Sequence, residues 1–346
     1  MERLYFHERD GMAASATRRL YEAFPFPSPG VNRPLIDVVA NELPLVVEGG
    51  LRDGWSVLDA GCGTGHTMIG LARAYPNVHF VGLEPSNASR GIAQRLAERH
   101  GITNVEFADG AMPDAVLERR FEFVYSFGVV HHLPDPKAGL KWLGDHLADH
   151  GLLHLWLYNA IGEIQRMRDR ELVRLMAADE DSHGLDVVRA LGLSLSLDAY
   201  GMPGAWAGAA LDQEEQDVFD ADAYLNPVVH TLRFGDLPEL LDGVTDWVAA
   251  DRVYGPDGAP YLDLSGTGEF AAQGPEVLRP EDLFEDPGLR TRIGGLGNLD
   301  RLRAVELVQR PTGFRVLAGR GRSLHRCTRR VAGNLLTGPA RGAPLP

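Results

Sequence analysis

Short apolar runs alternate with helical patterns between residues 55 and 160, and this alternation constrains the fold more than any other feature. WSVLDA, NVHFVGLEPS, NVEFADG, FEFVYSFG and LLHLWLYN are typical of strands, and amphipathic helical patterns separate most of them. Strand–helix units of this length build parallel sheets with helical crossovers. The carboxyl ends of such strands meet at one edge, where ligands bind. The sequence therefore predicts a doubly wound α/β fold.

Each of the first three predicted strands ends in an acidic residue. Asp59 closes the first strand, Glu84 the second and Asp109 the third. A carboxylate can accept charge-assisted hydrogen bonds from the two hydroxyl groups of a ribose, and an acid after the third strand can accept from an exocyclic amine. One such acid alone could be a solvated strand end or a helix cap. Three in succession predict a ligand site.

A glycine-rich turn, GCGTGH, follows Asp59 and precedes a helix. Its glycines let a ligand approach the backbone, and the helix start offers free N–H donors. Dinucleotide sites use G-x-G-x-x-G with a pyrophosphate at the helix start, whereas these glycines are spaced G-x-G-x-G. The acid at Asp59 opposes a pyrophosphate and suits a ligand with an ammonium group and one carboxylate. A nicotinamide oxidoreductase is therefore disfavoured.

Taken together, VLDAGCGTGH, Glu84, Asp109 and the segment after the fourth strand resemble the class I S-adenosylmethionine (SAM)-dependent methyltransferases over about residues 50 to 160. The resemblance implies a mostly parallel, seven-stranded Rossmann-like sheet, methyltransferase activity and SAM as the cofactor. It places the ribose hydroxyls at Glu84 and the adenine amino group at Asp109. The expected cofactor-binding residues are Asp59, Gly61, Cys62, Gly63, Glu84, Pro85, Asp109, Gly110, Ala111, Ser126 and Phe127.

The segment FGVVHHLPDP carries two adjacent histidines, and the resemblance places it beside the transferred methyl group. A metal site needs three or four converging ligands, and the other histidines are scattered, so no metal is expected. His131 is the candidate base or acceptor-positioning group, and His132 is expected to cap the next turn or pack under the sheet edge. Tyr158 is a third catalytic candidate. Asn159 is either part of the same site or a residue that satisfies its own loop.

Cysteine content and hydropathy indicate the expected location of the protein in the cell. The chain holds two cysteines, Cys62 and Cys327, and no Cys-x-x-Cys pair, so we expect no disulfide framework and a cytoplasmic location. Cys62 has no base beside it and is interpreted as a structural residue of the loop. No run of eighteen apolar residues occurs, and the start MERLYFHERDG lacks the apolar region of a secretory signal. Neither membrane insertion nor secretion is expected.

The regions outside the strand–helix pattern suggest four further segments around the core of residues 46–160. Residues 1–45 form a helical segment in which Tyr21, Phe24 and Phe26 are either a lid over the cofactor or a staple to the core. Strand signals vanish over 161–225, which predicts a helical cap insertion after the fifth strand. Residues 226–320 complete the sheet, with a last strand near 312–320. The basic stretch 321–346 is expected to be a flexible tail.

Charge narrows the choice of partners. Lysine and arginine number 34 against 48 acidic residues, which gives a formal net charge of −14. An acidic surface repels phosphate backbones, so no nucleic-acid partner is expected. The leading hypothesis is methyl transfer to an oxygen or nitrogen of a small molecule, in specialised metabolism. Another group transfer or cyclisation on SAM and methylation of a peptide or protein are the alternatives. The acceptor's identity and the oligomeric state, a homodimer included, stay open.

Overall fold

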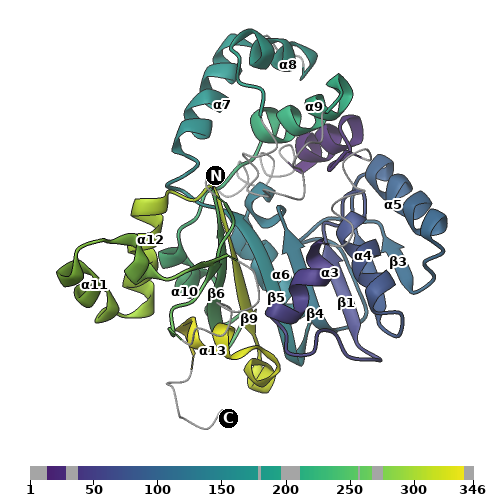
Figure 1. Cartoon of the computed structure of the whole chain (residues 1–346). Coiled ribbons are helices and arrows are strands. Elements are labelled where there is room, and N and C mark those ends of the chain that lie inside the picture. The colour runs from purple at the N-terminus through teal and green to yellow at the C-terminus, as the bar shows by residue number, and fades with distance from the viewer. Residues whose placement is uncertain are drawn as a thin grey trace, which may run out of the picture.

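The protein is described by a computed structural model that covers residues 14–28, 38–177, 181–195, 211–255, 258–266 and 276–338. Its centre is a ten-stranded sheet in the order β3-β2-β1-β4-β5-β9-β6-β7-β8, with β10 also paired to β6 (Figure 1). Helices cover both faces of this sheet. The predicted doubly wound α/β fold is confirmed.

The first half of the sheet is parallel, as the alternation of strands and helices predicted. Its strands are β1 (Ser56–Ala60), β2 (His79–Leu83), β3 (Val105–Ala108), β4 (Phe121–Phe127) and β5 (Leu147–Tyr158). The connecting helices are α4 (His66–Ala74), α5 (Asn87–His100) and α6 (Pro136–Asp145). The strand order reverses between β1 and β4, which is where ligands bind in open α/β sheets.

Local signals fix where these helices begin and end. The hydroxyl oxygen of Ser86 accepts a hydrogen bond from the Ser89 N–H at 3.1 Å and so caps α5, which ends at Gly101 in the left-handed conformation. The Asp135 carboxylate caps α6 by accepting from the Ala138 N–H at 3.0 Å, and Pro136 occupies the first turn.

The second half of the sheet contains a strand, β9, that runs against the direction of its neighbours. β9 (Gly313–Gly319) lies between β5 and β6 (Trp247–Tyr254) and runs antiparallel to both, so the sheet is mostly parallel. Three short strands extend the seven-stranded core: β7 (Tyr261–Leu262), β8 (Val277–Leu278) and β10 (Leu335–Thr337). The remaining elements here are α3 (Val38–Glu42), η1 (Leu43–Leu45), η5 (Phe234–Asp236), α10 (Leu237–Leu240), η6 (Pro280–Leu283), α11 (Pro287–Gly294) and α12 (Asn298–Gln309).

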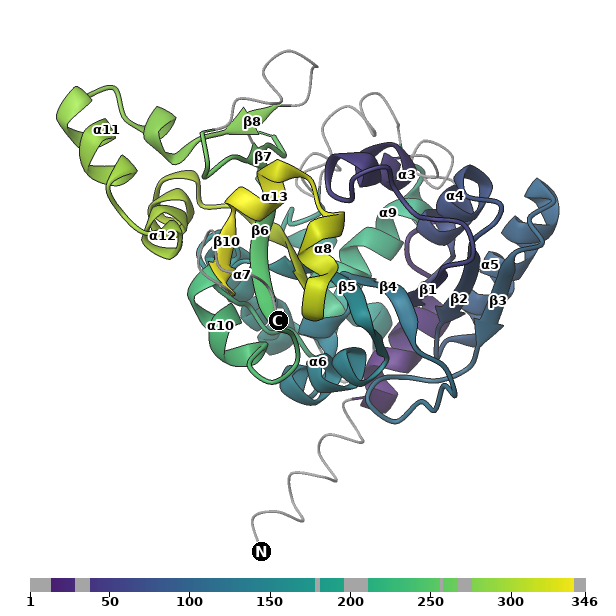
Figure 2. The same cartoon turned by 90° about the horizontal axis from the view of Figure 1, so that it is seen from below.

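Two apolar layers hold the helices on the sheet. One contains Leu58, Val124 and Leu155 and packs against α6, α10 and α12. The other contains Phe80, Phe123 and Leu317 and packs against α3 and α4. Figure 2 shows α3 and α4 on one side of the strands and α6 and α10 on the other. Both layers are continuous with the strands that end at the predicted ligand site.

A helical insertion follows the fifth strand, as predicted. α7 (Ile164–Met176), α8 (Asp181–Ala190), α9 (Gln213–Asp220) and the π-helical turn η4 (Ala221–Leu225) stand above the sheet in Figure 1. Residues 14–23 form a helix beside them, and Leu20 packs with Leu185 and Ala221 of the insertion. The N-terminal helix and the insertion therefore share a small apolar core.

The described part of the C-terminal stretch differs from the flexible tail that its basic composition suggested. Residues 321–338 contain η7 (Gly321–Arg326), α13 (Arg329–Gly333) and β10. Arg330 is fully buried, and its guanidinium pairs with the Asp251 carboxylate at 2.5 Å and donates to the carbonyl of Leu262 at 3.1 Å. A buried cation needs a partner, and the partner here lies in β6, so this segment packs against the sheet.

Two kinds of feature are absent from the described residues. None of their helices combines the length and apolar character that crossing a membrane requires. They also contain no group of three or more histidine, cysteine and acidic side chains placed to hold a metal ion.

Candidate active site

The glycine loop after β1 leaves no room for a side chain at Gly61 or Gly63. Gly61 has a φ of 90°, and a Cβ there would lie 2.4 Å from the Val129 side chain. Gly63 has a φ of 52°, and its Cβ would lie 2.4 Å from the carbonyl oxygen of Phe26. Both conformations favour glycine. The loop backbone is therefore packed between the segment after β4 and the N-terminal segment.

Glu84 lies directly after β2 and faces this loop. One carboxylate oxygen accepts from the Gly63 N–H at 3.0 Å, and the other accepts from the Ser86 N–H at 2.8 Å. Burial raises the pKa of Glu84 to about 7, although these two hydrogen bonds and Arg90 oppose the shift. Each carboxylate oxygen keeps a lone pair that can accept a hydroxyl group.

Asp59 ends β1 beside Glu84 and is also buried. The Tyr125 hydroxyl donates to its carboxylate at 2.8 Å. Burial raises the pKa of Asp59 to about 7, the hydrogen bond from Tyr125 opposes the shift, and the charge of Glu84 adds to it. Two neighbouring acids whose charged forms are disfavoured by burial would gain from a cationic ligand.

The third predicted acid has a different environment. The Asp109 side chain is 60% exposed and accepts from Arg90 at 3.0 Å. Arg90 also donates to the carbonyl oxygen of Glu84 at 2.6 Å, so it ties the ends of β2 and β3 together. Gly110 and Ala111 follow Asp109 at the same edge, and Ala111 is exposed. Asp109, Gly110 and Ala111 can therefore contact only a part of a ligand that lies near the solvent.

The other predicted cofactor residues differ in what they offer a ligand. The Ser126 hydroxyl donates to the Ala60 carbonyl at 2.8 Å inside the sheet, which leaves only its backbone. Burial raises the pKa of the Cys62 thiol well above its usual range, which fits its interpretation as a structural residue. Pro85 links Glu84 to the cap residue Ser86 and is partly buried. Phe127, at the end of β4, is also partly exposed.

The N-terminal segment crosses the cofactor half of the site. The Thr64 N–H donates to the carbonyl of Phe26 at 3.1 Å, and its hydroxyl donates to the carbonyl of Pro27 at 2.9 Å. The Glu22 carboxylate accepts from the Ser86 hydroxyl at 2.5 Å and from the Ala88 N–H at 3.0 Å. The segment thus contacts the glycine loop and the start of α5, in keeping with both the lid and the staple interpretations.

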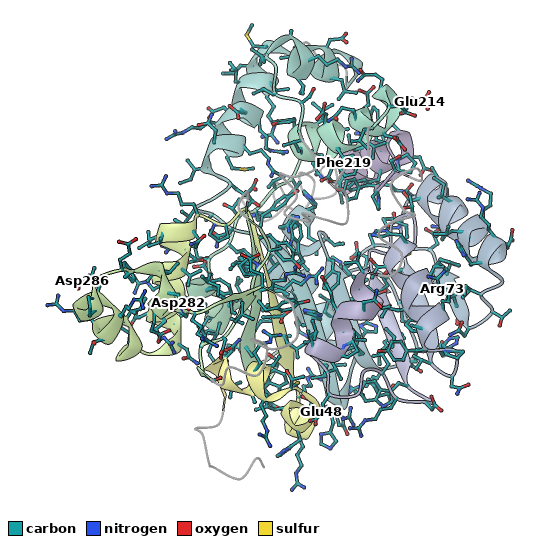
Figure 3. All side chains as sticks on the ribbon, in the orientation of Figure 1. Glu48, Arg73, Glu214, Phe219, Asp282 and Asp286 are labelled. Carbon is teal, nitrogen blue, oxygen red and sulfur yellow. The ribbon has the colours of Figure 1, made fainter. Side chains whose placement is uncertain are left out.

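Phe26 also joins this segment to the insertion. Its ring meets Phe219 of α9 edge to face, with ring centroids 5.4 Å apart. Figure 3 labels Phe219 on the lower side of the insertion, next to the N-terminal helix. The insertion and the N-terminal segment therefore cover the carboxyl edge of the sheet as one unit.

His131 is fully buried under this cover, in the turn η2 (Val130–His132). Its ring stacks on Tyr158 with centroids 3.9 Å apart. Neither ring nitrogen has a hydrogen-bond partner among the described residues. Burial lowers the pKa of His131 well below its usual range, and the nearby His132 adds to the shift. The imidazole is therefore neutral at pH 7 and has a nitrogen able to accept a proton.

His132 has a more structural environment. Its Nδ1 lies 2.8 Å from the carbonyl oxygen of Val228, which assigns the proton to Nδ1. Its Nε2 lies 3.9 Å from the Asp222 carboxylate. Burial lowers the pKa of His132, and Asp222 opposes the shift. The side chain holds the end of the insertion against the sheet edge instead of capping the next turn.

Tyr158, the last residue of β5, and Asn159, which follows it, have different environments. The Tyr158 hydroxyl lies 3.5 Å from the Asp222 carboxylate and shares the buried space of His131. Asn159 donates to Glu306 at 2.7 Å and accepts from the Ile161 N–H at 2.9 Å. Both ends of the Asn159 amide are used within the protein, one by Glu306 of α12 and one by its own loop, so Tyr158 is the stronger candidate for contact with a substrate.

Tyr21 was identified from the sequence as a lid or staple residue, but its polar neighbours Asp222 and Asn226 were not, nor were Glu163 and Arg166. The Tyr21 hydroxyl donates to Asp222 at 2.6 Å and accepts from the Asn226 amide at 2.9 Å. On α7, Glu163 pairs with Arg166 at 3.0 Å, and burial raises the pKa of Glu163 to about 7. A usable signal existed in EIQRMRDREL, where charged residues recur at helical spacing. That signal does not tell which face is buried.

These residues fit SAM as a ligand. SAM brings a positive charge, an amino group and two ribose hydroxyls, and the site offers two buried carboxylates with free lone pairs. Asp59 and Glu84 would hold the cofactor at the glycine loop, and Asp109 would meet it at the exposed edge. The His131–Tyr158 pair then lies on the acceptor side, because Val129, two residues before His131, packs against Gly61.

Comparison with known proteins agrees with this geometry. The sequence profile of the methyltransferase domain family matches residues 5–201. An uncharacterised protein of Synechococcus sp. is 26% identical over 266 residues, which are 73% of this chain and 57% of that protein. The probable (S)-tetrahydroprotoberberine N-methyltransferase 2 of Papaver bracteatum is 29% identical over 103 residues, 30% of this chain and 29% of the enzyme. The chain thus spans only part of the length of these relatives.

Solved structures repeat the fold. PKMT2 from Rickettsia typhi superposes with a TM-score of 0.56 at 14% identity and covers 89% of this chain and 55% of its own. The same protein in complex with AdoHcy gives a TM-score of 0.55 at 15% identity, with the same coverage. The family profile spans more than half of the sequence and includes the glycine loop, Glu84, Asp109 and His131. The chain therefore belongs to the methyltransferase domain family, as a member of the class I SAM-dependent methyltransferases.

Proposed function

We propose that this chain transfers the methyl group of SAM to an oxygen or nitrogen atom of a small molecule, in the cytoplasm and in specialised metabolism. The observation that carries the proposal is the buried imidazole of His131, which has no partner among the described residues and follows the segment packed on Gly61. A buried polar group without a partner is costly, so it is retained where a ligand completes it.

The chemistry divides between the cofactor and the chain. When bound, SAM supplies a methyl group already activated by its sulfonium. The chain then has to align the acceptor and, where the acceptor is protonated, remove its proton. Because burial keeps His131 neutral, a ring nitrogen can accept a hydrogen bond from the acceptor group and position it, and the stacked Tyr158 holds the ring in place. The same nitrogen is the candidate base, although burial disfavours its protonated form.

Burial favours a small acceptor over a protein. His131 and Tyr158 lie beneath the insertion and the N-terminal helix, and both are almost completely inaccessible. A side chain on the surface of a folded protein would have to unfold locally to reach them. The relative from Papaver bracteatum, named as an N-methyltransferase, supports a nitrogen acceptor as one of the two alternatives.

Isothermal titration with SAM and with its demethylated product tests the cofactor site. Glu84→Ala should lose about 1.5–3 kcal/mol of affinity for each charge-assisted hydrogen bond removed. His131→Ala should keep the affinity for both ligands and lower turnover, because it acts on the acceptor. An equal loss of SAM affinity in both variants would refute this division of roles.

Labelled SAM separates methyl transfer from other chemistry on the same fold. With a methyl-labelled cofactor, the product should carry the label. A product without it would instead assign the chain to a cyclisation or another group transfer. If wild-type protein binds neither SAM nor its product, the proposal is wrong.

A further inference from the structure

One row of side chains crosses the sheet from the glycine loop to a pair of arginines. The strand register pairs Phe127 of β4 with Trp156 of β5, Trp156 with Arg315 of β9, and Arg315 with Arg252 of β6. Paired residues on neighbouring strands point to the same face of a sheet. The row therefore runs along one face and begins beside the cofactor half of the site.

The far end of the row carries more positive than negative charge. Glu42 of α3 accepts from Arg252 at 2.5 Å and from Arg315 at 2.7 Å, so two guanidinium groups share one carboxylate. The side chains of Arg252, Arg315 and Glu42 are only 16%, 5% and 19% exposed. An uncompensated charge in a mostly dry environment is costly, so this cluster has the electrostatics of an anion site.

Two hydrogen-bond donors at this end have no acceptor in the part of the chain that the structure describes. The Nε of Arg315 and the hydroxyl of Tyr254 are buried and have no partner among the described residues. The guanidinium carbon of Arg315 lies 5.2 Å from the centroid of the Tyr254 ring, so the two side chains are neighbours. A ligand that brings a carboxylate would satisfy both and balance the extra charge.

The middle of the row is a partly open aromatic surface. Phe127 and Trp156 are partly exposed, although Tyr125 and Tyr158 beside them along the strands are buried. Gly313 makes room for the indole, because a Cβ there would lie 2.8 Å from Trp156. The Trp156 and His131 rings are 5.6 Å apart. A flat ligand on Trp156 would thus have one end near His131 and the other near Arg315.

We propose that this row is the acceptor subsite and that the acceptor is an aromatic carboxylic acid. Its ring lies on Trp156, beside Phe127, whose ring is already covered by the Arg315 guanidinium at 4.6 Å. Its carboxylate is bound by Arg315, Arg252 and Tyr254, and its oxygen or nitrogen nucleophile is directed at His131. The assignment rests on the proposed function, because only a methyl acceptor needs to reach from this row to His131.

Matched acids and amides test the subsite. The probes are 3,4-dihydroxybenzoate and 4-aminobenzoate, each compared with its carboxamide, titrated into the full chain with and without the demethylated cofactor. We expect each acid to bind at least tenfold more tightly than its amide. Arg315→Gln should abolish this preference and leave the affinity for the amide within about twofold, while the demethylated cofactor binds as in wild type.

Glu42→Gln provides a second variant with the opposite expected sign. Removing the shared carboxylate leaves both arginines for the ligand, so acid affinity should rise at least threefold. Equal binding of acid and amide by the wild type, or an unchanged acid preference in both variants, would overturn the subsite. Failure of the wild type to bind the demethylated cofactor would count against the proposed function alone, since the acid–amide comparison is also made without it.

Discussion

Asp59 and Glu84 are buried acids, and neither forms an ion pair with a cation among the described residues. Burial raises the pKa of each to about 7. A cationic ligand needs both in the charged form, so its binding should weaken as they take up protons. Ligand affinity and protein stability are therefore linked to the same protons.

The affinity for SAM should fall with acidification. Between pH 7.5 and 5.5 we expect a loss on the order of tenfold or more, because each pH unit below the pKa of an essential carboxylate costs about tenfold. The pKa of His131 is lowered, so this imidazole stays neutral over the same range and turnover at saturating SAM should change little. Calorimetry and initial rates over this range provide the measurement. A constant Kd would contradict the assignment of these carboxylates.

Replacing Asp59 by Asn should stabilise the ligand-free protein while weakening SAM binding. The pKa of Asp59 is raised to about 7 in the folded state from a usual 3.8, so ionisation destabilises the fold as the pH rises between these values. The gain should be below about 1 kcal/mol at pH 4 and on the order of 4 kcal/mol at pH 8. Urea unfolding at both pH values measures it. Asp114→Asn, at an exposed position, is the control and should show no such growth.

Among the elements, the N-terminal helix and the insertion depend on each other through Tyr21. Tyr21→Phe removes a hydrogen bond to Asp222 and leaves Asn226 without its acceptor. The expected cost is about 1–3 kcal/mol, concentrated in these two elements. Limited proteolysis should then cut within residues 14–28 faster than in wild type, and SAM affinity should fall with it. Lys141→Ala, in an exposed pair on α6, should leave both unchanged.

The elements also show what sequence could and could not predict. The strand–helix alternation and the acids at the strand ends depend on short-range patterns, and the structure bears these out. The acceptor side depends on contacts such as Tyr21 with Asp222, 201 residues apart, which no local pattern encodes. For α7, the pattern of apolar residues would predict the wrong buried face. The helix buries Arg166 and Arg170 and exposes four apolar side chains: Ile164, Leu172, Leu175 and Met176.

At the scale of the whole molecule, residues of the C-terminal stretch 321–338 pack against the sheet and connect its strands. Arg330 pairs with Asp251, whose other oxygen lies 3.2 Å from His154 of β5. Burial alone would raise the pKa of Asp251, but Arg330 and His154 hold it below its usual range. The cluster thus connects α13, β6 and β5, and it links the basic C-terminal stretch to the strands that support the site.

Arg330→Met should therefore destabilise the entire domain. The substitution leaves Asp251 as a buried, half-paired anion, and breaking such a pair costs about 3–5 kcal/mol. Because β6 and β5 carry Arg252 and Trp156, the loss should appear as an earlier global unfolding transition in urea and not as local fraying. Arg322→Ala, at an exposed position of the same stretch, should shift the midpoint by no more than about 0.5 kcal/mol. A small effect of both variants would mean that residues 321–338 add little to the fold, and the double variant Asp251→Asn with Arg330→Met should then be equally mild.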